Sequence, residues 1–142
     1  MIARCAVIVA AFVVLGSGLS AVDGKENDKD KLQGEWALVS AEFPSGKWDA
    51  NQIKAEKPLM IKGNEWTSSG FKFIFKIDPT KSPKQLDLQG EKNGKVNTLQ
   101  GIYKIDGDTL TFCRSLKPGG ARPTEFKAGD EVALLQFKRL GK

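Results

Sequence analysis

The most regular pattern of apolar and polar positions in this chain repeats every second residue. It is clearest where aromatic residues stand at positions 71, 73 and 75, with lysine at positions 72 and 76. Side chains of a β-strand point alternately to its two faces, so this spacing predicts a half-buried strand with an aromatic inner face. Weaker alternation recurs along the chain. We expect strands at 34–43, 59–62, 65–68, 71–77, 85–88, 96–105, 109–114 and 132–139, and a short extended piece at 123–126.

Turn signals separate these strands. Asn93-Gly94 and Asp106-Gly107 are typical of tight hairpin turns, whereas proline and glycine predict loops at 78–84 and 115–131. A short helix is expected within 48–57. Short strands connected in sequence predict an antiparallel meander, and closing such a sheet removes its two unpaired edges. The predicted fold class is therefore all-β, a barrel of about eight strands after a short N-terminal helical segment. A two-sheet sandwich is the alternative.

The first residues are predicted to form an export signal. Arg4 supplies a positive start, residues 5–15 are uninterruptedly apolar, and small residues dominate 16–21. This is the layout of a secretory signal peptide, with cleavage expected after Ala21. The predicted organisation is a signal peptide (1–21), a polar segment (22–30) and a barrel domain (31–142). The mature protein is expected in the bacterial periplasm or outside the cell.

The alternatives to a cleaved signal are a retained membrane anchor and a lipoprotein. A retained membrane anchor needs about 20 apolar residues, more than this run provides. In a lipoprotein the modified cysteine would follow the apolar run, whereas Cys5 begins it. We therefore expect no membrane span after cleavage.

Composition excludes most catalytic chemistry. The 142 residues include two cysteines and no histidine, which excludes Ser-His-Asp and Cys-His catalysis and histidine metal sites. After cleavage Cys113 would stand alone, and we expect a partly buried, inert thiol. Asp106 and Asp108 flank a turn glycine rather than forming an acid–base pair. The sequence thus predicts no catalytic residue, no metal and no cofactor, and we expect the protein not to be an enzyme.

The charges are mixed rather than clustered. The formal net charge is +5, and within residues 25–31 lysines are interspersed with acidic residues. Nucleic-acid-binding arms carry runs of one sign, so no nucleic-acid partner is expected. We expect a monomer.

Two sets of motifs carry a family resemblance. Gly34-Glu35-Trp36 resembles the Gly-x-Trp signature of lipocalins, in which the tryptophan plugs the closed end of the barrel and a late arginine packs over it; Arg139 is the matching arginine. A closer resemblance rests on motifs at 30–36, 75–79, 86–88, 101–110 and 122–126, the last reading Arg-Pro-Thr-Glu-Phe. Together these resemble a planctomycete lipocalin-like family of exported proteins. The resemblance implies a barrel and export, and structural roles for Gly34, Trp36 and Arg139; it carries over no activity or ligand.

Two functions are compatible with such a barrel. A small apolar or amphipathic ligand would lie against the aromatic residues of the predicted interior, which are Trp36, Phe71, Phe73, Phe75, Tyr103 and Phe112. The same residues would otherwise fill a packed core. Alternatively, a protein partner would bind the loops at 78–84 and 115–131. There Arg122 and Glu125 would face the partner, or form a structural ion pair.

Overall fold

Antiparallel strands make up most of the described chain. The structure is a computed structural model that describes residues 28–140, so the predicted signal peptide lies outside the described residues. Residues 28–32 are helical. The elements that follow are β1 (Gly34–Phe43), β2 (Gly46–Lys47), α2 (Ala50–Ala55), β3 (Leu59–Lys62), β4 (Glu65–Ser68), β5 (Phe71–Asp78), β6 (Lys84–Lys92), β7 (Lys95–Asp106), β8 (Thr109–Ser115) and β9 (Val132–Arg139).

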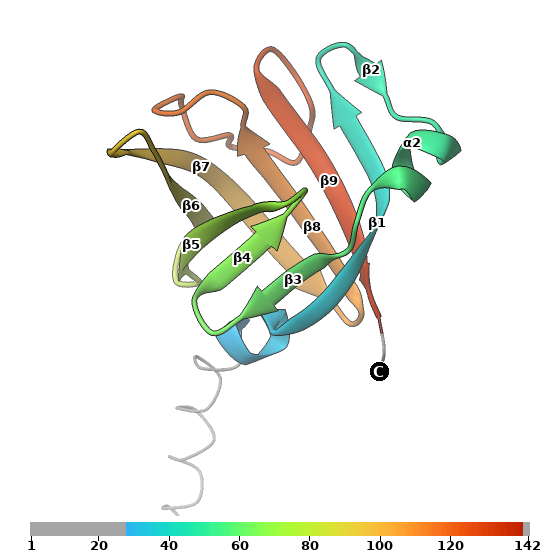
Figure 1. Cartoon of the computed structure of the whole chain (residues 1–142), viewed down its shortest axis with the longest axis horizontal. Helices are drawn as coiled ribbons and strands as arrows, with labels where there is room; N and C mark the ends of the chain where they lie inside the picture. The colour runs from blue at the N-terminus through green and yellow to red at the C-terminus, as the bar shows by residue number, and fades with distance from the viewer. Residues whose placement is uncertain (1–27, 141–142) are drawn as a thin grey trace, which may run out of the picture. The chain divides into compact units, whose positions relative to one another are not determined.

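The strands close into a barrel, which lies in the compact unit Leu32–Lys142. Strands β3 to β9 pair in sequence order, and β1 pairs with both β3 and β9 (Figure 1). The result is a closed antiparallel barrel of eight strands. Strand β2 pairs with the end of β1 and extends from the ring. The predicted all-β barrel is therefore confirmed, and the two-sheet sandwich is wrong.

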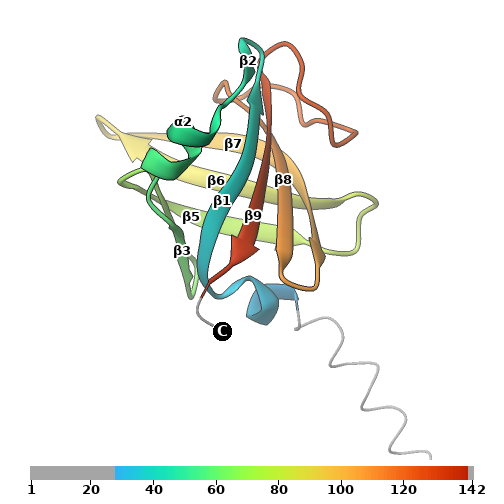
Figure 2. The same cartoon turned by 90° about the vertical axis from the view of Figure 1, so that its right-hand side faces the viewer.

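The connections gather at the two ends of the barrel. At one end, which we call the Trp36 end, β1 begins and β9 ends, together with the β3–β4 and β7–β8 turns. The opposite end, the loop end, holds the β2–α2 segment, the β4–β5 and β6–β7 turns and the long β8–β9 loop (residues 116–131). Figure 2 shows the β2 hairpin and the β8–β9 loop at the top. Four connections from separate parts of the chain thus meet at the loop end.

The inner face of the barrel packs into a core centred on aromatic rings. The ring of Trp66 lies 5.2 Å from that of Phe112 and 6.0 Å from that of Phe75, measured between centroids. Both contacts are tilted or edge-on, as aromatic pairs prefer. Tyr103 and Trp36 are fully buried in the same core. Most of the interior is therefore filled by side chains.

Strand β1 contains an irregularity that alternation does not predict. Its register with β9 shifts between Leu38 and Ser40. A β-bulge adds one residue to one strand and so reverses the faces beyond it. Ala41, 1% exposed, consequently follows Leu38 on the inner face, and Val39 is 47% exposed. Strict alternation along 34–43 would put Ser40 on the face of Trp36, and the bulge is the reason that it does not lie there.

Helix α2 confirms the predicted short helix. The Asp49 carboxylate accepts a hydrogen bond from the backbone N–H of Gln52, and the Gln52 side chain accepts one from the backbone N–H of Asp49, each at 2.9 Å. This reciprocal capping box satisfies N–H groups that a first helical turn leaves without partners. Trp48, just before the helix, packs on Phe43 of β1 with ring centroids 5.0 Å apart. The helix is thereby tied to the loop end.

Candidate functional site

The Trp36 end is plugged by the residues that the Gly-x-Trp motif singled out. The Arg139 guanidinium lies 4.2 Å from the centroid of the Trp36 ring, which is the contact expected from the sequence. The indole N–H of Trp36 donates to the carbonyl oxygen of Leu32 at 2.9 Å. Arg139 also donates to the carbonyl oxygen of Gln33 at 3.0 Å. Gly34, with a φ of +117°, lies beside the same guanidinium. These contacts give the motif a structural role.

The six aromatic residues predicted to line one ligand site do not lie together. Trp36, Phe75, Tyr103 and Phe112 are buried in the packed core, whereas Phe71 is 67% exposed. The prediction of Phe71 as an interior residue is therefore wrong. The pairing of β5 with β6 begins only at Ile74 and Gln89, so the first residues of β5 and the last residues of β6 lie apart at the loop end.

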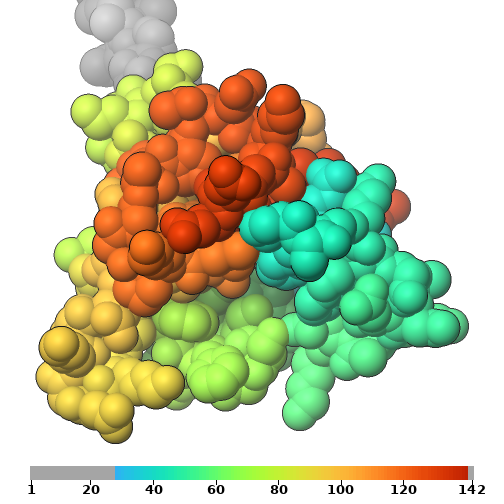
Figure 3. All heavy atoms as spheres, turned by 90° about the horizontal axis from the view of Figure 1, so that it is seen from above, coloured from blue at the N-terminus to red at the C-terminus, as the bar shows by residue number. Residues whose placement is uncertain are grey.

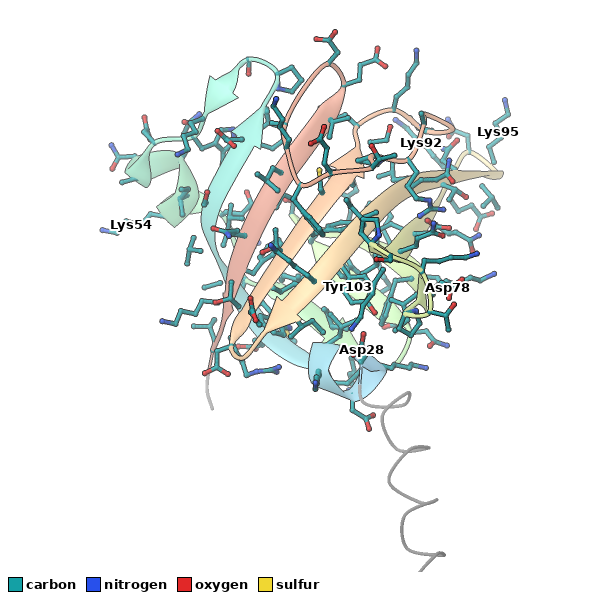
Figure 4. The ribbon with its side chains drawn as sticks, turned by 180° about the vertical axis from the view of Figure 1, so that it is seen from behind. Asp28, Lys54, Asp78, Lys92, Lys95 and Tyr103 are labelled. Atoms are coloured by element: carbon teal, nitrogen blue, oxygen red, sulfur yellow. The ribbon has the colours of Figure 1, made fainter. Side chains whose placement is uncertain are left out.

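A cleft opens between β5 and the β6–β7 hairpin where these strands part. Its volume is about 300 Å³, and Phe71, Phe73, Leu99 and Pro118 form its apolar walls. The molecule is visibly hollowed beside the yellow β6–β7 hairpin when it is viewed from above (Figure 3). Lys92 lines the rim, and Figure 4 shows it near the tip of that hairpin. Of the predicted ligand residues, only Phe71 and Phe73 line this cleft.

Gly90 makes room for one wall of the cleft. A side-chain carbon at position 90 would lie 3.0 Å from two carbons of the Phe73 ring. Contacts this short are rare, so the ring lies directly over the bare backbone of β6. Phe73 is thereby placed between the cleft and the barrel interior.

Arg114 is a residue that the sequence analysis did not single out. It pairs with Gly101 and Ala133, and it lines two small cavities inside the loop end, of about 40 and 70 Å³. Burial lowers the pKa of its guanidinium, although arginine stays charged in proteins. The signal was present in the sequence, because the inward positions Leu110 and Phe112 continue to 114 with a period of two.

The charge of Arg114 has no carboxylate partner among residues 28–140. Its one side-chain hydrogen bond there is donated to the carbonyl oxygen of Ser115, at 3.1 Å. Glu56 lines the larger cavity, but its carboxylate accepts a hydrogen bond from Ser69 and makes no ion pair with Arg114. Walls of leucine and aromatic side chains surround the guanidinium instead. Arg114 is thus a partly buried cation facing a largely apolar interior.

Arg122 ties the β8–β9 loop to the outside of the barrel. It donates to both carboxylate oxygens of Asp87, at 2.7 and 3.4 Å, to the carbonyl oxygen of Gly101 at 2.8 Å and to the side-chain oxygen of Gln100 at 2.9 Å. Arg122 therefore forms an ion pair with Asp87 on β6 and not with Glu125. The predicted pairing of Arg122 with Glu125 is wrong. Arg122 is engaged within the chain rather than presented to a partner.

We call residues 116–131 the strap, because they cover the outer face of β7 and β8. Cys113 is fully buried there, with its thiol 3.5 Å from the carbonyl oxygen of Glu125 and 3.6 Å from that of Lys127. Burial raises the pKa of the Cys113 thiol. The strap also holds the predicted extended piece at 123–126, which forms no strand. The thiol is therefore shielded and poorly nucleophilic.

Within residues 28–140 no cluster of three or more histidine, cysteine, aspartate or glutamate side chains is arranged to hold a metal ion. Over that range no helix has the length and apolar character needed to cross a membrane. Comparisons with protein-family models, curated proteins and solved structures give no match to this chain.

Proposed function

We propose that this protein is an exported, non-enzymatic β-barrel that binds a small apolar or amphipathic molecule in the cleft at its loop end. The observation that carries the proposal is the cleft of about 300 Å³ with apolar walls. Sites for small ligands are concave, largely apolar and of roughly 300–1,000 Å³, so this cleft suits a compact ligand. The packed core supports placing the ligand at the mouth rather than deep inside the barrel.

The exposure of Phe71 supports the same proposal. A phenylalanine that is 67% exposed leaves most of its apolar surface in water. Covering such a surface is favourable by about 25 cal/mol per Å². A ligand in the cleft would cover the face of Phe71 that lines it. The strap residue Pro118 would contact the ligand from the opposite side.

Filling the cleft should abolish ligand binding without disturbing the barrel. Asn97→Trp places a large ring at a position that lines the cleft. The uncharged fluorophore N-phenyl-1-naphthylamine is expected to bind the wild type saturably, with a rise in fluorescence. The variant should bind at least about ten-fold more weakly, which corresponds to about 1.4 kcal/mol. Fluorescence titration measures the affinity of the wild type and of the variant for the fluorophore.

Val96→Trp is the matched control. Val96 is the neighbouring residue on β7, is 66% exposed and lines a groove on the other side of the hairpin. The Val96→Trp variant should leave the affinity for the fluorophore unchanged. If Val96→Trp weakens binding and Asn97→Trp does not, the site is the outer groove. Equal affinity of all three proteins would refute the cleft as a binding site.

Export and cleavage form the second part of the proposal. The apolar run at 5–15 and the small residues up to Ala21 support a signal peptide, and the Arg139–Trp36 contact supports a lipocalin-like family. Expressed in bacteria with its own N-terminus, the protein should be recovered outside the cytoplasm with Val22 as its first residue. Intact mass and N-terminal sequencing measure this. Recovery of a chain that keeps Met1 to Ala21 would contradict cleavage.

A further inference from the structure

We propose that the ligand carries a single carboxylate and that Arg114 binds it, with the apolar part of the ligand lying in the loop-end cleft. This inference rests on the proposed function and names its ligand class. The basis of the inference is Arg114, a charged side chain that faces the barrel interior and is surrounded there mainly by apolar side chains.

No carboxylate of residues 28–140 neutralises the charge of Arg114. A guanidinium presents several N–H donors in a planar fork. Within residues 28–140 the side chain of Arg114 makes one hydrogen bond, which it donates to the carbonyl oxygen of Ser115. Taking an ion out of water without a counter-charge is costly, so buried charges are normally paired. Arg122 and Arg139, on the same barrel, each have a carboxylate partner. A ligand that brings a negative charge to Arg114 would remove this cost.

Arg114 lies behind two wall residues of the cleft. The small cavity beside Arg114, of about 40 Å³, has Phe73 and Leu99 in its wall. These two side chains also line the larger cleft of about 300 Å³. They therefore stand between the cleft and the guanidinium. A ligand whose tail contacts Phe73 and Leu99 can direct its head group past them toward Arg114.

The size of the space beside Arg114 limits the kind of anion that fits. The cavity of about 40 Å³ is only a few times the roughly 10–15 Å³ that one water molecule needs, so it admits only a compact head group. A planar carboxylate matches the guanidinium fork with two parallel hydrogen bonds and needs less room than a phosphate. Ser68 lines both small cavities and adds a hydroxyl.

The test compares ligands that share a tail and differ in their head group. Octanoate, octan-1-ol and octyl phosphate each compete with N-phenyl-1-naphthylamine for the wild type and for Arg114→Met. We expect octanoate to bind the wild type at least about ten-fold more tightly than octan-1-ol. In Arg114→Met this preference should disappear, with the affinity for octan-1-ol retained. Arg114→Lys keeps the charge without the fork, and it should keep a reduced preference.

The outcomes separate the two proposals. If octan-1-ol competes and octanoate binds no better, the carboxylate assignment is overturned and the apolar cleft stands. Tighter binding of octyl phosphate than of octanoate also overturns it. If no ligand competes and the fluorophore does not bind, both proposals fail.

A second readout separates ligand binding from a structural role of Arg114. Removing an unpaired, partly buried charge should raise the thermal midpoint of the unliganded protein. A lower midpoint for Arg114→Met than for the wild type would indicate a structural arginine and contradict the proposal.

Discussion

Replacing Trp36 with alanine is expected to lower the free energy of unfolding by about 3–5 kcal/mol. The side chain is fully buried, so its removal leaves a large space at the end of the barrel where β1, β3 and β9 meet. The carbonyl oxygen of Leu32 loses its indole donor, and the Arg139 guanidinium loses the ring beneath it. Small domains have net stabilities of only 5–15 kcal/mol. Urea unfolding, followed by circular dichroism, measures the change.

Trp36→Phe separates the contributions of the ring and the hydrogen bond. Phenylalanine keeps an aromatic face under Arg139 and loses the N–H that donates to Leu32. We expect it to cost clearly less than alanine, because most of the buried apolar area is retained. Val39→Ala, at a position that is 47% exposed on the same strand, should change stability little. A loss below about 1 kcal/mol for Trp36→Ala would contradict the plugging role.

Replacing Arg122 with methionine is expected to release the strap and expose Cys113. Methionine keeps the apolar stem and removes the donors to Asp87, Gln100 and Gly101. Hydrogen bonds to charged groups contribute about 1.5–3 kcal/mol, so we expect a loss of about 3 kcal/mol in the free energy of unfolding. Strap opening should become easier as well. A reduction of about 1.4 kcal/mol in the opening free energy raises the open population ten-fold.

The thiol of Cys113 reports strap opening directly. It is fully buried and lies near the carbonyl oxygens of Glu125 and Lys127, and burial raises its pKa, so labelling in the wild type should be slow. Reaction with a coloured disulfide reagent, under conditions where both proteins remain folded, should be at least about ten-fold faster in Arg122→Met. Residues 28–140 contain no other cysteine, which makes the signal specific in a mature chain that lacks Cys5.

Glu125→Gln is the control for the strap. Its carboxylate is exposed and makes no ion pair or hydrogen bond in the described chain, although its backbone accepts from Cys113. The variant should leave both the stability and the labelling rate unchanged. Equal labelling rates for Arg122→Met and the wild type would show that other contacts hold the strap. A loss of stability in Glu125→Gln would instead support the original pairing of Arg122 with Glu125.

The sequence by itself determined the barrel and its plugged end. Alternation with a period of two and the Asn-Gly and Asp-Gly turns are properties of short segments. They can therefore be recognised without knowing which strands are neighbours in the fold. The resemblance to the Gly-x-Trp motif identified Trp36 and its partner Arg139, although these two residues lie on β1 and β9, the first and last strands of the barrel. The short helix within 48–57 also follows from local capping chemistry.

The tertiary structure decided which residues the site contains. The bulge after Leu38 and the parting of β5 from β6 depend on strand register, which moved Ala41 inward and left Phe71 at the rim. Alternation along β8 already places Arg114 on the inner face, but only the closed barrel decides which apolar side chains surround it. Arg122 meets Asp87, 35 residues away, because the strap folds back across the strands. Such contacts depend on register, closure and loop path, which arise from interactions over the whole chain and which periodicity within one segment does not encode.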